Sequence, residues 1–162
     1  MSRPYPEVTT VLASLAPHFH CGVIANQVPG LARRLAEWGI DRFFDVVVSS
    51  GELGVEKPDP RIFTYALDQA RCVASQAVMI GDRPDNDIWP AAAVGMRTLW
   101  VRQGVGGLMI VPDVVAPDVT GAGTGPGAGR AMNQATPDAT VDNLAGVLEV
   151  LLPKVGIALE VT

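Results

Sequence analysis

The sequence predicts an α/β fold in which a parallel sheet is flanked by helices. Four short apolar runs alternate with stretches of helical periodicity, a pattern typical of strands joined by crossover helices. The runs cover residues 21–25, 43–48, 77–80 and 98–101. Polar residues directly follow the first and third of these runs, and ligands of open parallel sheets bind at the carboxyl ends of strands. Residues 1–162 form one domain of sufficient length to bury a core.

Stripes of apolar residues with helical spacing separate these runs. They cover residues 8–15, 31–38, 60–70, 88–94 and 144–151. Asp59-Pro60 predicts a helix start, because aspartate caps the first turn and proline suits the first helical position. Gly39 and Gly95 each follow a stripe and suit the left-handed conformation in which many helices end.

The composition changes after residue 101. Residues 104–138 are rich in Gly, Pro, Ala and Asp, and they include GAGTGPGAG at 121–129. This stretch fits neither GxGxxG nor the P-loop pattern, so we expect a flexible loop. A short strand at 139–141 and a helix follow, and residues 156–162 are apolar and strand-like.

Charge and composition argue against several kinds of partner. The net charge is −5, so neither nucleic acid nor an anionic membrane surface is expected. No run approaches 18 consecutive apolar residues, and the first residues lack the apolar core of a secretory signal. Cys21 and Cys72 lie far apart and form no CxxC pair, which favours reduced thiols in a cytoplasmic protein.

Four polar residues stand out as candidates for chemistry. Asp82 and Asp87 follow the run at 77–80, and two carboxylates suit Mg²⁺, which also takes water and phosphate oxygens. The structural alternative is that Asp82 ends a strand and that Asp87 or a neighbour caps a helix. Asn26 is either a turn residue or a polar group aimed at the same crevice. Lys57 is either a solvated charge or a fixed cation ahead of a helix.

Together these groups resemble the haloacid dehalogenase (HAD)-like hydrolase superfamily. The resemblance rests on GVIANQ at 22–27, GVEKPDPRIF at 54–63 and GDRPDNDI at 81–88, in the order that the family has. It covers roughly residues 5–101 and the strand and helix at 140–152. It implies a Rossmann-like core and Mg²⁺-dependent, phosphatase-type hydrolysis of a small phosphorylated metabolite.

The resemblance also implies a role for each residue. Asp82 and Asp87 would hold the metal, and Lys57 would offset the charge of the phosphoryl oxygens. Asn26 would bind a phosphate oxygen or orient a neighbour. These roles are coherent, because catalysis of phosphoryl transfer is largely positioning and electrostatic stabilisation. We therefore expect Lys57 and Asn26 as catalytic and phosphate-binding residues, and Asp82 and Asp87 as Mg²⁺ ligands.

The sequence departs from the family in two places. Ala25 stands where the second motif has Ser or Thr, and Asp-x-Asp-x-Thr, which carries the nucleophile, occurs nowhere. The cap domain that often follows that motif is missing, and the chain is expected to begin where such a cap ends. The family's central strand would be missing too. The strands at 21–25 and 77–80 would then flank a gap with unpaired backbone groups.

Three hypotheses account for these departures. The chain could come from a truncated reading frame of a phosphatase, inactive without its nucleophile. It could be a non-catalytic module that binds metal and phosphate or docks a partner. Residues 156–162 could instead fill the gap and place Glu160 near the nucleophile's position. An incomplete sheet would favour a homo-oligomer or a partner that completes it. The substrate is not predicted, because the cap largely sets specificity in this family.

Overall fold

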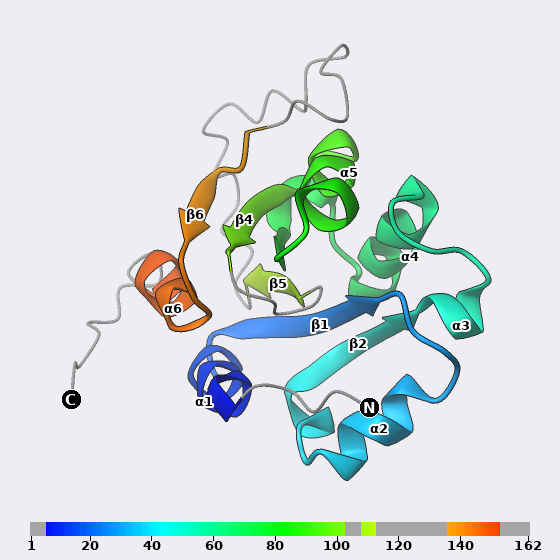
Figure 1. Cartoon of the computed structure of the whole chain (residues 1–162), viewed down its shortest axis with the longest axis horizontal. Coiled ribbons are helices and arrows are strands. Elements are labelled where there is room, and N and C mark those ends of the chain that lie inside the picture. Colours follow the sequence, from blue (N-terminus) through cyan, green and yellow to red (C-terminus); the bar gives the residue numbers. More distant parts are fainter. Residues whose placement is uncertain (1–5, 103–107, 113–135, 153–162) are drawn as a thin grey trace.

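One six-stranded sheet lies between two layers of helices (Figure 1). This is a computed structural model, and it describes residues 6–102, 108–112 and 136–152. The strand order is β2-β1-β5-β3-β4-β6. The strands are β1 (Phe19–Ala25), β2 (Phe44–Ser49), β3 (Val78–Gly81), β4 (Arg97–Val101), β5 (Leu108–Pro112) and β6 (Ala139–Val141). The predicted α/β class, with a sheet flanked by helices, is confirmed.

Helices cover both faces of the sheet. They are α1 (Pro6–Leu15), α2 (Leu31–Glu37), α3 (Ser50–Leu53), α4 (Pro60–Ala70), α5 (Trp89–Ala93) and α6 (Ala145–Leu151). Short turns of other helical types are η1 (Asp41–Phe43), η2 (Ala74–Gln76) and η3 (Pro84–Ile88). α1, α2 and α6 share one core cluster with Ile80, whereas α4 and α5 share the other with Met79. Successive side chains of β3 thus lie in opposite cores, because side chains along a strand alternate between the two faces of the sheet.

The helix ends follow the local signals in the sequence. Asp59 caps α4 by accepting a hydrogen bond from the backbone N–H of Arg61 at 2.9 Å, and Pro60 occupies the first turn. Gly39 has a φ of 74° and Gly95 a φ of 100°, so both adopt the left-handed conformation expected after their helices. These predicted boundaries are confirmed.

The centre of the sheet differs from the expectation. β5 lies between β1 and β3 and runs antiparallel to both, whereas the other pairs are parallel. The predicted gap is therefore filled, and the predicted loop over 104–138 is wrong for residues 108–112. Burial gives the physical reason: Leu108 is 4% exposed and Met109 1% exposed, one in each core. The strand also forms ladder pairs with β1 and with β3, whose backbone groups would otherwise lack hydrogen-bond partners on that side.

The position of β5 affects two further expectations, the role of the tail and the tendency to associate. The tail at 156–162, with Glu160, lies outside the described residues, and β5 takes the position proposed for it. The reason given for association, an open sheet, no longer applies between β1 and β3. No helix in the described part of the chain has the length and apolar character needed to cross a bilayer.

Candidate functional site

Three of the four candidate residues, Asn26, Lys57 and Asp87, are joined by hydrogen bonds near the carboxyl ends of β1 and β3. Asn26 directly follows β1, and Asp82 directly follows β3. Lys57 lies in the segment between α3 and α4, and Asp87 lies in η3. The chain topology therefore brings these residues together at the edge of the sheet where ligands bind in open α/β folds.

A buried ion pair forms the centre of this group. Lys57 Nζ lies 2.6 Å from Asp87 Oδ1, and the two side chains are 6% and 3% exposed. Charges this deeply buried require a partner, because desolvation of a lone ion is costly. An ammonium group has three N–H donors, so Lys57 can bind Asp87 and still donate to ligand oxygens.

The loop after β3 fixes the other side of Asp87. Asp87 Oδ2 accepts a hydrogen bond from the backbone N–H of Arg83 at 3.2 Å. A Cβ at Gly81 would lie only 2.4 Å from the Asp87 side chain. The glycine at the strand end therefore provides the space in which this carboxylate packs.

Asn26 contacts the backbone of Lys57. The Lys57 N–H donates to Asn26 Oδ1 at 2.7 Å, and Asn26 Nδ2 donates to the Lys57 carbonyl at 2.9 Å. Both polar groups of the Asn26 amide thus engage the main chain of a single residue. Asn26 joins the end of β1 to the segment that carries the buried cation.

Asp82 is partly buried, and its backbone is held by a residue that the sequence did not single out. Trp100 in β4 donates from Nε1 to the carbonyl of Asp82 at 3.1 Å. The Asp82 carboxylate has no hydrogen-bond partner in the described ranges. Each oxygen of Asp87, by contrast, already accepts one hydrogen bond and keeps further acceptor capacity.

β5 stops short of this edge. Its first residue, Leu108, pairs with Val23 in β1 and with Ile80 in β3. β1 continues to Ala25 and β3 to Gly81, so Asn26 and Asp82 follow strand ends that project beyond β5.

A family model for haloacid dehalogenase-like hydrolases matches residues 1–101, more than half of the chain. The chain belongs to the haloacid dehalogenase-like hydrolase family. All four candidate residues lie within the match, whereas β5, β6 and α6 lie beyond it. The resemblance stated from the motifs is confirmed.

Curated relatives of this haloacid dehalogenase-like chain include named phosphatases. It is 37% identical over 103 residues to a phosphoserine phosphatase of Thermus thermophilus, a match that covers 62% of this chain and 41% of that protein. It is 46% identical over 104 residues to a glyceraldehyde 3-phosphate phosphatase of Pyrococcus abyssi, covering 63% and 44%. The chain spans less than half the length of these relatives.

Solved structures of the family share the fold. A 2-haloacid dehalogenase of Pseudomonas syringae pv. Tomato superimposes with a TM-score of 0.67 at 32% identity, over 94% of this chain and 54% of that one. A HAD phosphatase of Thermococcus onnurineus also gives 0.67, at 22% identity over 91% and 57%. The second likeness concerns the fold alone.

The donor set fits Mg²⁺ in one specific way. No group of three or more His, Cys, Asp or Glu side chains gathers within the described residues. A site built from three or more clustered side chains of these types is therefore absent from the described residues. Mg²⁺ needs less, because it keeps several waters and takes one or two carboxylates together with substrate phosphates. Two carboxylates in the loop after β3, those of Asp82 and Asp87, suit that pattern.

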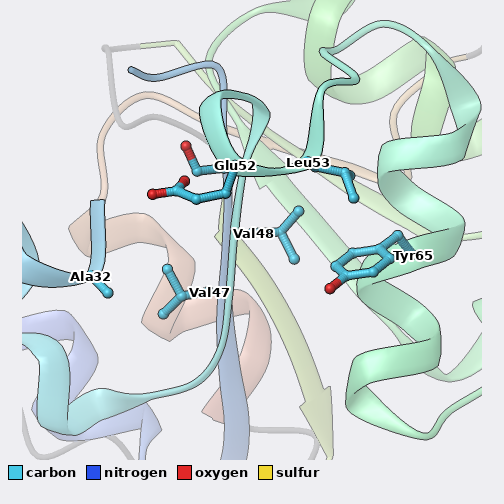
Figure 2. A pocket seen from close by; sticks show the side chains of 7 residues that line it. Ala32, Val47, Val48, Glu52, Leu53 and Tyr65 are labelled. Atoms are coloured by element: carbon cyan, nitrogen blue, oxygen red, sulfur yellow. The ribbon is translucent and has the colours of Figure 1, made fainter. Parts of the chain in front are cut away.

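A separate pocket lies beside the edge strand β2 (Figure 2). Its volume is about 250 Å³, and it is lined by Ala32, Val47, Val48, Ser49, Glu52, Leu53 and Tyr65. In the view of Figure 2, Glu52 and Tyr65 lie on opposite sides of Val48. The N–H of Gly30 and the hydroxyl of Ser49 lower the pKa of Glu52. None of the four candidate residues lines this pocket, so it is distinct from their site.

Proposed function

We propose that this chain carries a phosphatase-type site that binds Mg²⁺ and the phosphoryl group of a small phosphorylated molecule. Lys57 donates to phosphoryl oxygens, and Asp82 holds the metal with help from Asp87. When bound, the metal neutralises negative charge on the phosphoryl group as Lewis acids do. The names of the curated relatives support this reaction class.

The observation that carries this proposal is the buried Lys57–Asp87 pair, whose carboxylate lies in the same loop after β3 as Asp82. The Lys57 side chain is 6% exposed and lies in a region of low dielectric, where its charge interactions, with Asp87 and with a ligand, are stronger than in water. Because the ion pair fixes the ammonium, little reorganisation is needed when a dianion arrives. Fixed charge of this kind is the main contribution that a protein makes to phosphoryl transfer.

A second candidate is a module that binds metal and phosphate without turnover. Two observations favour it. The sequence has no Asp-x-Asp-x-Thr, and apolar β5 residues lie between β1 and β3. Among the described residues of the loop after β3, the carboxylates of Asp85 and Asp87 are each held in an ion pair, with Arg83 and with Lys57. We also propose a cytoplasmic location, because no disulfide joins Cys21 to Cys72.

Hydrolysis of p-nitrophenyl phosphate distinguishes the two candidates. We expect the 162-residue chain, if it turns over, to need Mg²⁺ and to lose about 100-fold or more of its rate in Asp82→Asn, the usual scale for removing one transition-state contact. Asp85→Asn is the matched control, because Asp85 forms an exposed pair with Arg83. Equal inactivity of all three proteins, with Mg²⁺ binding retained in the parent, supports the binding module instead.

A further inference from the structure

Asn26 stands apart from the other site residues because both the oxygen and the nitrogen of its side-chain amide bind the backbone of Lys57. Its carbonyl oxygen accepts from the Lys57 N–H at 2.7 Å, and its amide nitrogen donates to the Lys57 carbonyl at 2.9 Å. Rotating this amide away from Lys57 would leave both peptide groups of Lys57 without their partners, at the cost of two unmade hydrogen bonds.

The segment after Asn26 is itself held in place. The carbonyl of Gln27 accepts from the backbone N–H of Gly51 at 2.9 Å and from the hydroxyl of Ser49 at 3.1 Å. The N–H of Gln27 donates to the hydroxyl of Ser50 at 3.0 Å. A Cβ at Gly51 would come within 2.5 Å of this segment, so the two backbones approach closely. Asn26 therefore binds Lys57 from a segment that these hydrogen bonds hold against the start of α3.

Lys57 is fixed at both ends as a result. Asn26 holds its peptide groups, and Asp87 holds its ammonium at 2.6 Å. The chain of contacts from Asn26 through Lys57 and Asp87 to the Arg83 N–H links the carboxyl ends of β1 and β3. These two strands do not pair with each other, because β5 separates them. This chain of contacts thus sets where the cation sits relative to Asp82.

We propose that Asn26 is a positioning residue that acts on the phosphoryl group through Lys57 and does not touch it. This inference rests on the proposed function, since it assigns Lys57 to the phosphoryl group. If Asn26 acts in this way, removing its amide weakens phosphate binding although Asn26 itself makes no direct contact with the phosphate. Loss of a residue that orients a metal ligand typically costs about 10–100-fold in metal affinity or activity, and we expect an effect of this size for a residue that orients a phosphate-binding cation.

The first test is the affinity for inorganic phosphate in the presence of Mg²⁺, measured by isothermal titration. We expect Asn26→Ala to bind phosphate about 10-fold or more weakly than the parent at a temperature where circular dichroism shows both folded. Gln27→Ala removes an exposed amide from the next residue and is expected to bind like the parent. Equal affinity of Asn26→Ala and the parent would overturn the inference and leave the proposed function intact. A parent that binds no phosphate would overturn both.

The second test uses the parent protein alone and so does not depend on how a variant folds. A scalar coupling across the hydrogen bond between Asn26 Nδ2 and the Lys57 carbonyl carbon reports this contact by NMR. We expect this coupling to be detected both before and after phosphate and Mg²⁺ are added. Its disappearance on phosphate binding would mean that the Asn26 amide turns to the ligand, which contradicts a positioning role.

Discussion

Replacing Asp87 with asparagine is expected to lower the free energy of unfolding by about 3–5 kcal/mol, the usual cost of leaving a buried charge without its partner. Asp87 accepts two hydrogen bonds, from Lys57 Nζ and from the Arg83 N–H. An asparagine has one oxygen, so its NH₂ group would face one of these donors. The ammonium of Lys57, 6% exposed, would lose its counter-charge.

Urea unfolding followed by circular dichroism, without divalent cations, measures this loss. Asp85→Asn is the control, because Asp85 and Arg83 form a pair whose side chains are 54% and 59% exposed. Such surface pairs contribute about 0–1 kcal/mol. Adding Lys57→Met to Asp87→Asn removes the uncompensated cation and should restore part of the stability. An Asp87→Asn protein within about 1 kcal/mol of the parent would show that the pair is not buried.

Replacing Met109 with alanine is expected to cost about 2–5 kcal/mol, the range for large-to-small changes in a packed core. Met109 is 1% exposed and belongs to the core cluster that includes Met79 and Phe63. Its strand pairs with both β1 and β3, so the cavity would open at the centre of the sheet. A Cβ at Gly22 would lie 3.1 Å from the Met109 methyl carbon, which indicates tight packing there.

The same unfolding experiment tests this placement of β5. Val73→Ala is the control, since Val73 is 61% exposed and a change at such a site usually stays within about 0.5 kcal/mol. A Met109→Ala protein as stable as the Val73→Ala protein would mean that residues 108–112 do not form the middle strand.

Local patterns were enough to predict most of the strands and helices. The apolar runs at 21–25 and 77–80 correspond to β1 and β3, and Asp59-Pro60 starts α4. Polar residues after a strand led to Asp87 and the motif ahead of a helix led to Lys57, and the structure joins the two in one ion pair. These signals lie within a few residues of one another, so sequence alone reveals them.

Longer-range features could not be predicted in the same way. The apolar run that forms β5 is five residues long and lies in a Gly-rich stretch, and the composition of that stretch predicted a loop. Its antiparallel direction depends on β1 and β3, which lie far from it in the chain. The bonds from Asn26 to Lys57 and from Trp100 to Asp82 likewise depend on loop geometry that no local pattern specifies.

We propose that Asp82 holds Mg²⁺ together with a phosphoryl group that Lys57 binds. Isothermal titration of Mg²⁺ into the 162-residue chain with inorganic phosphate tests it most directly. We predict saturable binding at one site, its loss in Asp82→Asn and its retention in Asp85→Asn. Absence of binding in the parent, or equal binding by the parent and Asp82→Asn, would contradict the claim.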